Sequence, residues 1–160
     1  MSKEAIILAS VWLLTIILLI IYVPKEKIRH ANIIFLFKQS ITWLFGLTVV
    51  EFKLIQYPYR IFEHAHNTSF SFEFFIFPGI CVLFNLYYPV KKNKLKKLIH
   101  YINYCTLITI IEIILERYTD LINYINWSWF WTWITLLVTF YASRKYYLWF
   151  FKHKISQNQD

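Results

Sequence analysis

The chain has 160 residues, of which 58% are hydrophobic and 21% aromatic, and only two are glycines. A soluble domain averages about 45–50% apolar residues, and the excess here lies in blocks separated by short charged connectors. The formal net charge is +8, but the basic residues cluster at the ends of the apolar blocks. This placement favours membrane anchoring and argues against nucleic-acid binding. Cys81 and Cys105 both lie inside apolar blocks, which argues against a disulfide framework.

Five apolar runs predict an all-α, polytopic membrane protein with one membrane domain over residues 1–160. A helix rises 1.5 Å per residue, so runs of about 20 residues can cross a hydrocarbon layer of about 30 Å. The predicted spans are 5–23, 31–55, 71–88, 98–116 and 125–145. Residues 56–70 are too polar to span and are expected to lie in the interface as a short helix or loop.

The lysine-rich segment 91–97 sets the predicted orientation of the chain. Cytoplasmic loops of membrane proteins are enriched in Lys and Arg, so this segment is expected to face the cytoplasm. With five alternating spans, 12 of the 17 Lys and Arg residues then lie inside. The N-terminus is therefore predicted outside and the C-terminus inside.

The acidic residues are distributed the opposite way from Lys and Arg. In the predicted topology, all but Glu26 and Asp160 lie outside the membrane or in its outer half. Four glutamates from three predicted helices lie at similar depth: Glu51, Glu73, Glu112 and Glu116. On the fourth span, Tyr101, Cys105, Thr109, Glu112 and Glu116 project within about 60° of one another. This stripe is expected to face the bundle interior, since a carboxylate facing lipid is costly.

If the four glutamates converge, they form an acidic pocket that opens outward and binds a cation, a proton or an amine. In the alternative interpretation, each glutamate lies at headgroup level or pairs with Arg60, Arg117 or Lys53. The pattern does not decide between the two.

Lys38 lies inside the second span, where its long stem is expected to snorkel toward the cytoplasmic headgroups. A polar contact between helices is the other reading. Gly46 and Gly79 predict close contact between the second and third spans. Pro78 should bend the third span and leave the carbonyl of Phe74 to a neighbouring polar group or water.

His64 and His66 form a weak candidate metal site, since no third ligand stands at a diagnostic spacing. No cofactor is predicted. Trp127, Trp129, Trp131 and Trp133 are typical of an outer aromatic belt. The sequence contains no intramembrane-protease, metalloprotease or nucleotide-loop motif, which argues against an enzyme.

Four segments together resemble a known group of proteins: RHANIIFLFKQSITWLFGLTVVEF, QYPYR, NTSFSFEFFIFPGICVLFNLYYP and EIILERYTDLINYINWSWFW. They are similar to a family of small, uncharacterised integral membrane proteins of endospore-forming bacteria. The resemblance implies several helical spans and a location in the bacterial cytoplasmic membrane. It implies no activity, substrate or cofactor.

Two functional hypotheses follow. The first is a small transporter or channel-like subunit whose acidic pocket binds a cation or proton. The second is a non-catalytic accessory protein, such as a complex subunit or an envelope-stress component. The expected partners are the lipid bilayer and either further copies of the chain or another membrane protein.

Overall fold

The computed structural model describes residues 2–62 and 64–152, and it is all-α with five helices and 75% helical content. The predicted fold class is confirmed at that level. The elements in chain order are α1 (Lys3–Tyr22), the 3-10 turn η1 (Lys25–Lys27), α2 (Ile28–Glu51), β1 (Ile55–Gln56), the π-helical segment η2 (Ser71–Ile76), α3 (Phe77–Leu86), α4 (Lys94–Tyr118), β2 (Asn123–Tyr124) and α5 (Trp129–Phe150).

Three helical segments are long and apolar enough to cross a membrane: Lys3–Tyr22, Lys25–Glu51 and Lys94–Tyr118. Residues Ser71–Leu86 form a shorter apolar helix. Large apolar side chains are exposed on the outside of the bundle, with Ile20 75% and Leu107 60% exposed. Such a surface is unusual for a soluble monomer and suits a lipid environment.

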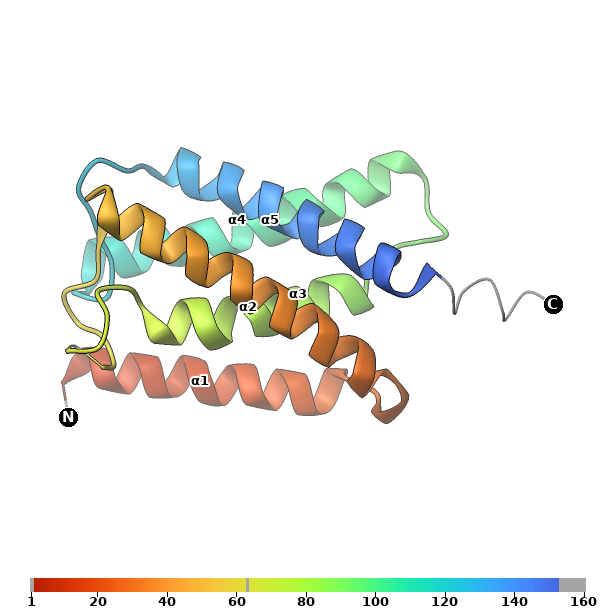
Figure 1. Cartoon of the computed structure of the whole chain (residues 1–160), viewed down its shortest axis with the longest axis horizontal. Coiled ribbons are helices and arrows are strands. Elements are labelled where there is room, and N and C mark those ends of the chain that lie inside the picture. Colours follow the sequence, from red (N-terminus) through yellow and green to blue (C-terminus); the bar gives the residue numbers. More distant parts are fainter. Residues whose placement is uncertain (1, 63, 153–160) are drawn as a thin grey trace.

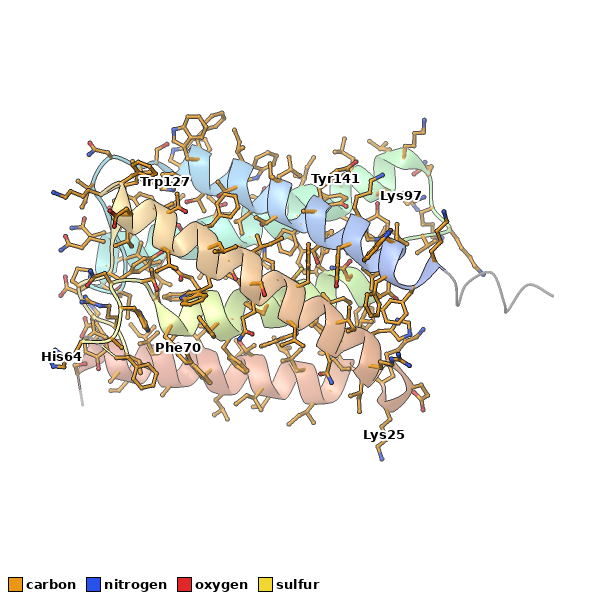
Figure 2. All side chains as sticks on the ribbon, in the orientation of Figure 1. Lys25, His64, Phe70, Lys97, Trp127 and Tyr141 are labelled. Carbon is orange, nitrogen blue, oxygen red and sulfur yellow. The ribbon has the colours of Figure 1, made fainter. Side chains whose placement is uncertain are left out.

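The helices run roughly along one axis, so the connections gather at two ends (Figure 1). The loop end holds the start of α1 together with residues 52–70 and 119–128. The lysine end holds residues 23–27 and 87–93 and the last turn of α5. In Figure 2, Lys25 and Lys97 lie toward the lysine end and His64 at the loop end. Helix α1 packs against η2 and α3, and only its Leu8 and Thr15 are buried.

The second helix begins at Ile28 and not at residue 31, and it ends at Glu51 and not at residue 55. Lys53 adopts a positive φ of 52°. The N–H of Leu54 then donates to the carbonyl of Val49 at 2.8 Å, and that of Lys53 donates to Val50 at 2.9 Å. This is a left-handed C-terminal cap, which satisfies the last carbonyls and turns the chain away from the helix axis.

The other helix ends differ from the predicted spans for similar reasons. Helix α5 begins at Trp129 and not at 125, because the N–H groups of Ile125 and Asn126 both donate to the carbonyl of Leu54. Helix α4 begins at Lys94 and not at 98, since the Asn93 side chain accepts from the N–H of Lys96 at 3.0 Å. Asparagine is a favoured residue at such an N-terminal cap.

The two loops at the loop end are joined to each other. Strands β1 and β2 pair antiparallel, with Ile55 opposite Tyr124 and Gln56 opposite Asn123. The interior is divided into two apolar clusters, one around Phe84 and Phe140 and the other around Tyr57. Side chains from both clusters line a polar cavity.

Candidate functional site

The cavity has a volume of about 80 Å³ and is lined by side chains from α2, η2, α4, α5 and the two loops. Its principal polar side chains are Lys38, Thr42, Tyr57, Glu73, Glu112, Thr132 and Thr139. A space of this size and polarity accommodates a few water molecules or one small ion, and no drug-sized molecule.

Glu73 is the most exceptional of these residues. Its side chain is 2% exposed, and neither carboxyl oxygen has a hydrogen-bond partner of good geometry among the described residues. The polar groups beside the carboxyl are the hydroxyls of Tyr57 and Thr68 and the backbone of Ser69. The backbone carbonyl of Glu73 accepts from Thr42 Oγ1 at 2.7 Å, which fixes the π-helical turn against α2. A buried carboxyl without partners is costly, so its position inside the bundle needs an explanation.

Gly46 makes room for this carboxyl. A methyl group at position 46 would overlap all three atoms of the Glu73 carboxyl group. The predicted close contact between the second and third apolar helices therefore holds at Gly46. The same prediction is wrong for Gly79, where an added Cβ would lie 2.7 Å from Thr15 Cγ2 of α1. The interface at Gly79 is with the first helix, because the two glycines face different neighbours.

Glu112 is also buried, at 8% exposure, but it is held firmly. Its Oε1 accepts from the Tyr124 hydroxyl at 2.6 Å and from Thr132 Oγ1 at 2.9 Å. Trp127 Nε1 donates to the same Thr132 hydroxyl at 2.9 Å. The two carboxyls of the cavity thus have contrasting surroundings, one fixed by hydroxyl donors and the other without partners.

Two tyrosines from the loops place protonated hydroxyls beside the cavity carboxyls, Tyr57 near Glu73 and Tyr124 on Glu112. Burial, with the charges of Glu73 and Glu112 beside it, raises the pKa of the Tyr57 phenol well above its ordinary value. Burial and the neighbouring Glu112 likewise raise the pKa of Tyr124. Both phenols therefore remain hydrogen-bond donors throughout the physiological range.

Lys38 does not snorkel to the headgroups as predicted. Its side chain is fully buried, with Nζ 2.5 Å from Thr139 Oγ1 and 4.6 Å from the centre of the Phe140 ring. The hydroxyl and the aromatic face of α5 supply the partners that water would otherwise provide. The alternative expectation, a polar contact between helices, describes this arrangement.

The carbonyl freed by Pro78 has the predicted polar partner. Gln39 Nε2 donates to the carbonyl oxygen of Phe74 at 2.9 Å. The predicted interior stripe on α4 is largely confirmed as well: Tyr101, Cys105, Thr109 and Glu112 are buried, whereas Glu116 is half-buried.

The four predicted glutamates do not share one cavity. Glu51 is exposed at the end of α2, and Glu116 is half-buried; neither lines the cavity that holds Glu73 and Glu112. Arg117 is exposed. Arg60 braces its own loop, donating to the carbonyls of His66 and Tyr57 at 2.9 and 2.8 Å.

The predicted metal site at the histidines and the predicted aromatic belt of tryptophans have different outcomes. Within the described residues, no group of three His, Cys, Asp or Glu side chains is arranged to hold a metal ion. His66 Nδ1 lies 3.0 Å from the carbonyl of Thr68, and His64 is exposed. Trp129 and Trp131 are more than half exposed, as an aromatic belt requires, whereas Trp127 lines the cavity.

Several residues of the site were not predicted from the sequence. Tyr57 and Trp127 line the cavity, and Tyr124 bonds its Glu112, from two loops that pair at the loop end. Thr132 and Thr139 did carry a signal, since together with Ser143 they recur on one face of α5. Hydroxyl residues are common in membrane helices, so that spacing alone does not identify a site.

Comparison with protein-family models, with curated proteins and with solved structures finds no match to this chain. The chemistry that the site can support therefore follows from its geometry alone. Two carboxyls, one ammonium and several hydroxyls around a small cavity can bind a cation of small radius or exchange protons.

Proposed function

We propose that this chain is a five-span protein of the bacterial cytoplasmic membrane, with its N-terminus outside and its C-terminus inside. Three segments long and apolar enough to span a membrane, and a fourth, shorter apolar helix, support this proposal. So do Lys25 and Lys97, which lie at the same end of the bundle (Figure 2), since cytoplasmic ends are rich in Lys and Arg. The sequence resemblance to small membrane proteins of endospore-forming bacteria agrees with the same placement.

We further propose that the protein is a small transporter or channel-like subunit that binds a cation or a proton in its internal cavity. The carrying observation is the Glu73 carboxyl, which is 2% exposed, unpartnered among the described residues, and directed into a cavity shared with Glu112. Ionisable groups inside a membrane bundle are costly and mark ion and proton pathways.

The charges that line the cavity favour a monovalent ligand. With both carboxyls ionised and Lys38 protonated, Glu73, Glu112 and Lys38 carry a net formal charge of −1. One proton or one small monovalent cation neutralises this charge, whereas a divalent ion overshoots it. The volume of about 80 Å³ favours the same small ligands.

Purified protein in liposomes tests this proposal. We expect wild-type protein to pass protons or a small monovalent cation down an imposed gradient. Glu73→Gln and Glu112→Gln should each abolish this flux, because a neutral amide keeps the shape of the side chain and removes the charge. Ion-sensitive dyes enclosed in the liposomes measure the rate.

Glu51→Gln is the matched control, because Glu51 is an exposed glutamate outside the cavity. Its flux should equal that of the wild type. Flux that survives both cavity substitutions would contradict the proposal, as would wild-type protein that moves no cation. The second outcome would favour the accessory-protein hypothesis instead.

A further inference from the structure

A groove on the surface of the bundle lies between α4 and α5, apart from the internal cavity. It has a volume of about 480 Å³ and is lined by Lys97, Leu98 and Tyr101 of α4 and by Leu137, Val138 and Tyr141 of α5. Leu98, Val138 and Tyr141 are more than half exposed, so this α4–α5 groove is open to the surroundings of the bundle. Figure 2 shows Lys97 and Tyr141 on the same side of the bundle, toward the lysine end.

Lys97 differs from the other lysines of the segment 91–97. The other four are exposed, whereas Lys97 is half-buried and lines the α4–α5 groove. A lysine can bury its aliphatic stem along apolar surface and keep its charged head at the polar edge. Lys97 therefore supplies a positive charge to the groove itself, and not only to the surface around it.

A second lysine reaches the groove from the other helix. Lys145 Nζ lies 5.5 Å from the centre of the Tyr141 ring, which forms part of the groove. Because α4 and α5 run in opposite directions, Lys97 precedes Tyr101 by four residues and Lys145 follows Tyr141 by four. Each lysine is thus one helical turn nearer the lysine end than its tyrosine. Two ammonium groups from two helices therefore lie on the lysine-end side of the groove.

Arg144 adds a buried positive charge beside the groove. It follows Tyr141 by three residues, so the two side chains are neighbours on α5. Its side chain is 7% exposed, and Nη1 donates to the backbone carbonyl of Asn85 at 3.3 Å. Its Nε has no hydrogen-bond partner among the described residues. The guanidinium lies 4.2 Å from the centre of the Tyr88 ring, and that ring lies 5.8 Å from the ring of Tyr101 in the groove wall.

Acidic residues do not balance these positive groups. The six residues that line the groove include no acid. Among the described residues, Glu26 is the only acid at the lysine end, and it lies on η1, between α1 and α2. A buried cation without a paired acid is costly, so an anion at the groove would offset part of that cost.

We propose that the α4–α5 groove binds one anionic phospholipid. The phosphate lies between the ammonium groups of Lys97 and Lys145, and an acyl chain lies over the apolar side chains Leu98, Leu137 and Val138. Basic pockets between membrane helices on the cytoplasmic side are sites for acidic lipid headgroups. This inference uses the proposed membrane placement and goes beyond the proposed cation site, on which it does not depend.

The charges and the apolar lining favour a phospholipid over two other occupants. A second copy of the chain, docked here by two-fold symmetry, would bring the same lysines of both copies together, and such like-charge contacts are unfavourable. A free phosphate ion would contact the ammonium groups but leave the apolar walls uncovered. A phospholipid satisfies both parts of the groove.

Thermal unfolding of the purified protein in an uncharged detergent tests this inference. Micelles are doped with increasing mole fractions of dioleoyl phosphatidylglycerol, or of dioleoyl phosphatidylcholine, which has the same chains and no net charge. The anionic lipid should raise the Tm until the effect saturates, because it binds only the folded protein. Phosphatidylcholine and inorganic phosphate should leave the Tm unchanged. Native mass spectrometry should find one phosphatidylglycerol retained on each chain.

Substitutions on both parts of the groove locate the site. Lys97→Gln and Lys145→Gln should each raise the half-saturating mole fraction about tenfold, since each removes a charge-assisted hydrogen bond. Val138→Trp should also weaken binding although both lysines remain, because a large side chain fills the apolar part. Val138 is 53% exposed, so the added bulk does not enter the core. The Tm of each variant without lipid checks that it is folded.

Lys92→Gln is the matched control, because it removes the same charge from an exposed position at the same end, outside the groove. Its half-saturation should equal that of the wild type. A loss as large as that of Lys97→Gln would overturn the site in favour of diffuse attraction to the lysine end. Equal stabilisation by phosphatidylcholine would overturn the role of charge, and equal stabilisation by inorganic phosphate would overturn the role of the lipid.

Discussion

Two glutamates of the same cavity differ in what surrounds them. Glu112 accepts two hydroxyl donors on a single oxygen, whereas Glu73 has no hydrogen-bond partner for either oxygen among the described residues. Donors hold a carboxyl in one position, whereas a carboxyl without such donors is available to a ligand. Under the proposed function, Glu73 is therefore the carboxyl that contacts the ligand, and Glu112 is the carboxyl held beside it.

Tyr124→Phe tests the support of Glu112. The substitution removes the 2.6 Å hydrogen bond and leaves Thr132 as the remaining donor. Hydrogen bonds to charged groups and between membrane helices suggest a loss of about 1–2 kcal/mol. Thermal unfolding in detergent should show a lower Tm, and the cost should shrink when Glu112 is already glutamine.

The exposed Tyr118 offers a matched substitution, because Tyr118→Phe removes the same hydroxyl far from the cavity. Its Tm should remain that of the wild type. Equal Tm values for the two variants would mean that Tyr124 does not stabilise Glu112.

At the scale of elements, the junction between η2 and α3 depends on a helix elsewhere in the chain. Pro78 lacks the N–H that would bond the carbonyl of Phe74, and Gln39 of α2 takes its place. The sequence was sufficient to predict that this carbonyl needs a partner. It was not sufficient to predict which partner, because that depends on how α2 and α3 are rotated against each other.

A double substitution measures how far the Gln39 side chain replaces the missing N–H of Pro78. Gln39→Leu should lower the stability by about 1 kcal/mol, since a carbonyl inside the bundle loses its donor. Adding Pro78→Ala supplies a backbone N–H and should recover part of the loss. Thermal unfolding of the two single variants and the double variant gives the coupling between the positions. Strictly additive losses would contradict the replacement.

The helix boundaries show where prediction from the sequence failed. The apolar runs located all five helices, because long periodic segments carry a strong signal. The ends at 51 and 129 were missed, since they depend on a lysine with positive φ and on two short strands that pair across loops. Neither feature is visible in hydropathy.

For the whole molecule, the proposed topology puts the lysine end in the cytoplasm and the loop end outside. The lysine end carries Lys25 and Lys97 in Figure 2, and the loop end carries His64. The positions of the glutamates along the chain predict how deep each one lies in the bundle. They do not predict which glutamates face the same cavity. Rotation about each helix axis decides which carboxyls meet, and only Glu73 and Glu112 do.

Single cysteines at exposed positions determine the orientation. His64→Cys should react with a membrane-impermeant maleimide in intact cells, whereas Lys92→Cys should react only after the membrane is opened. The native Cys81 and Cys105 are fully buried, so unaltered protein is the control and should remain unlabelled. The reverse labelling pattern would invert the proposed topology.

The fit between Gly46 and Glu73 restricts the order in which this protein can change over generations. A side chain at 46 is incompatible with the acid at 73, but a smaller residue at 73 leaves the space beside Gly46 open. A lineage can therefore replace Glu73 first and Gly46 afterwards. In the reverse order, the intermediate protein has a side chain at 46 that overlaps the Glu73 carboxyl. Once the space is filled, the acid cannot return by one substitution, because position 46 must first become glycine again.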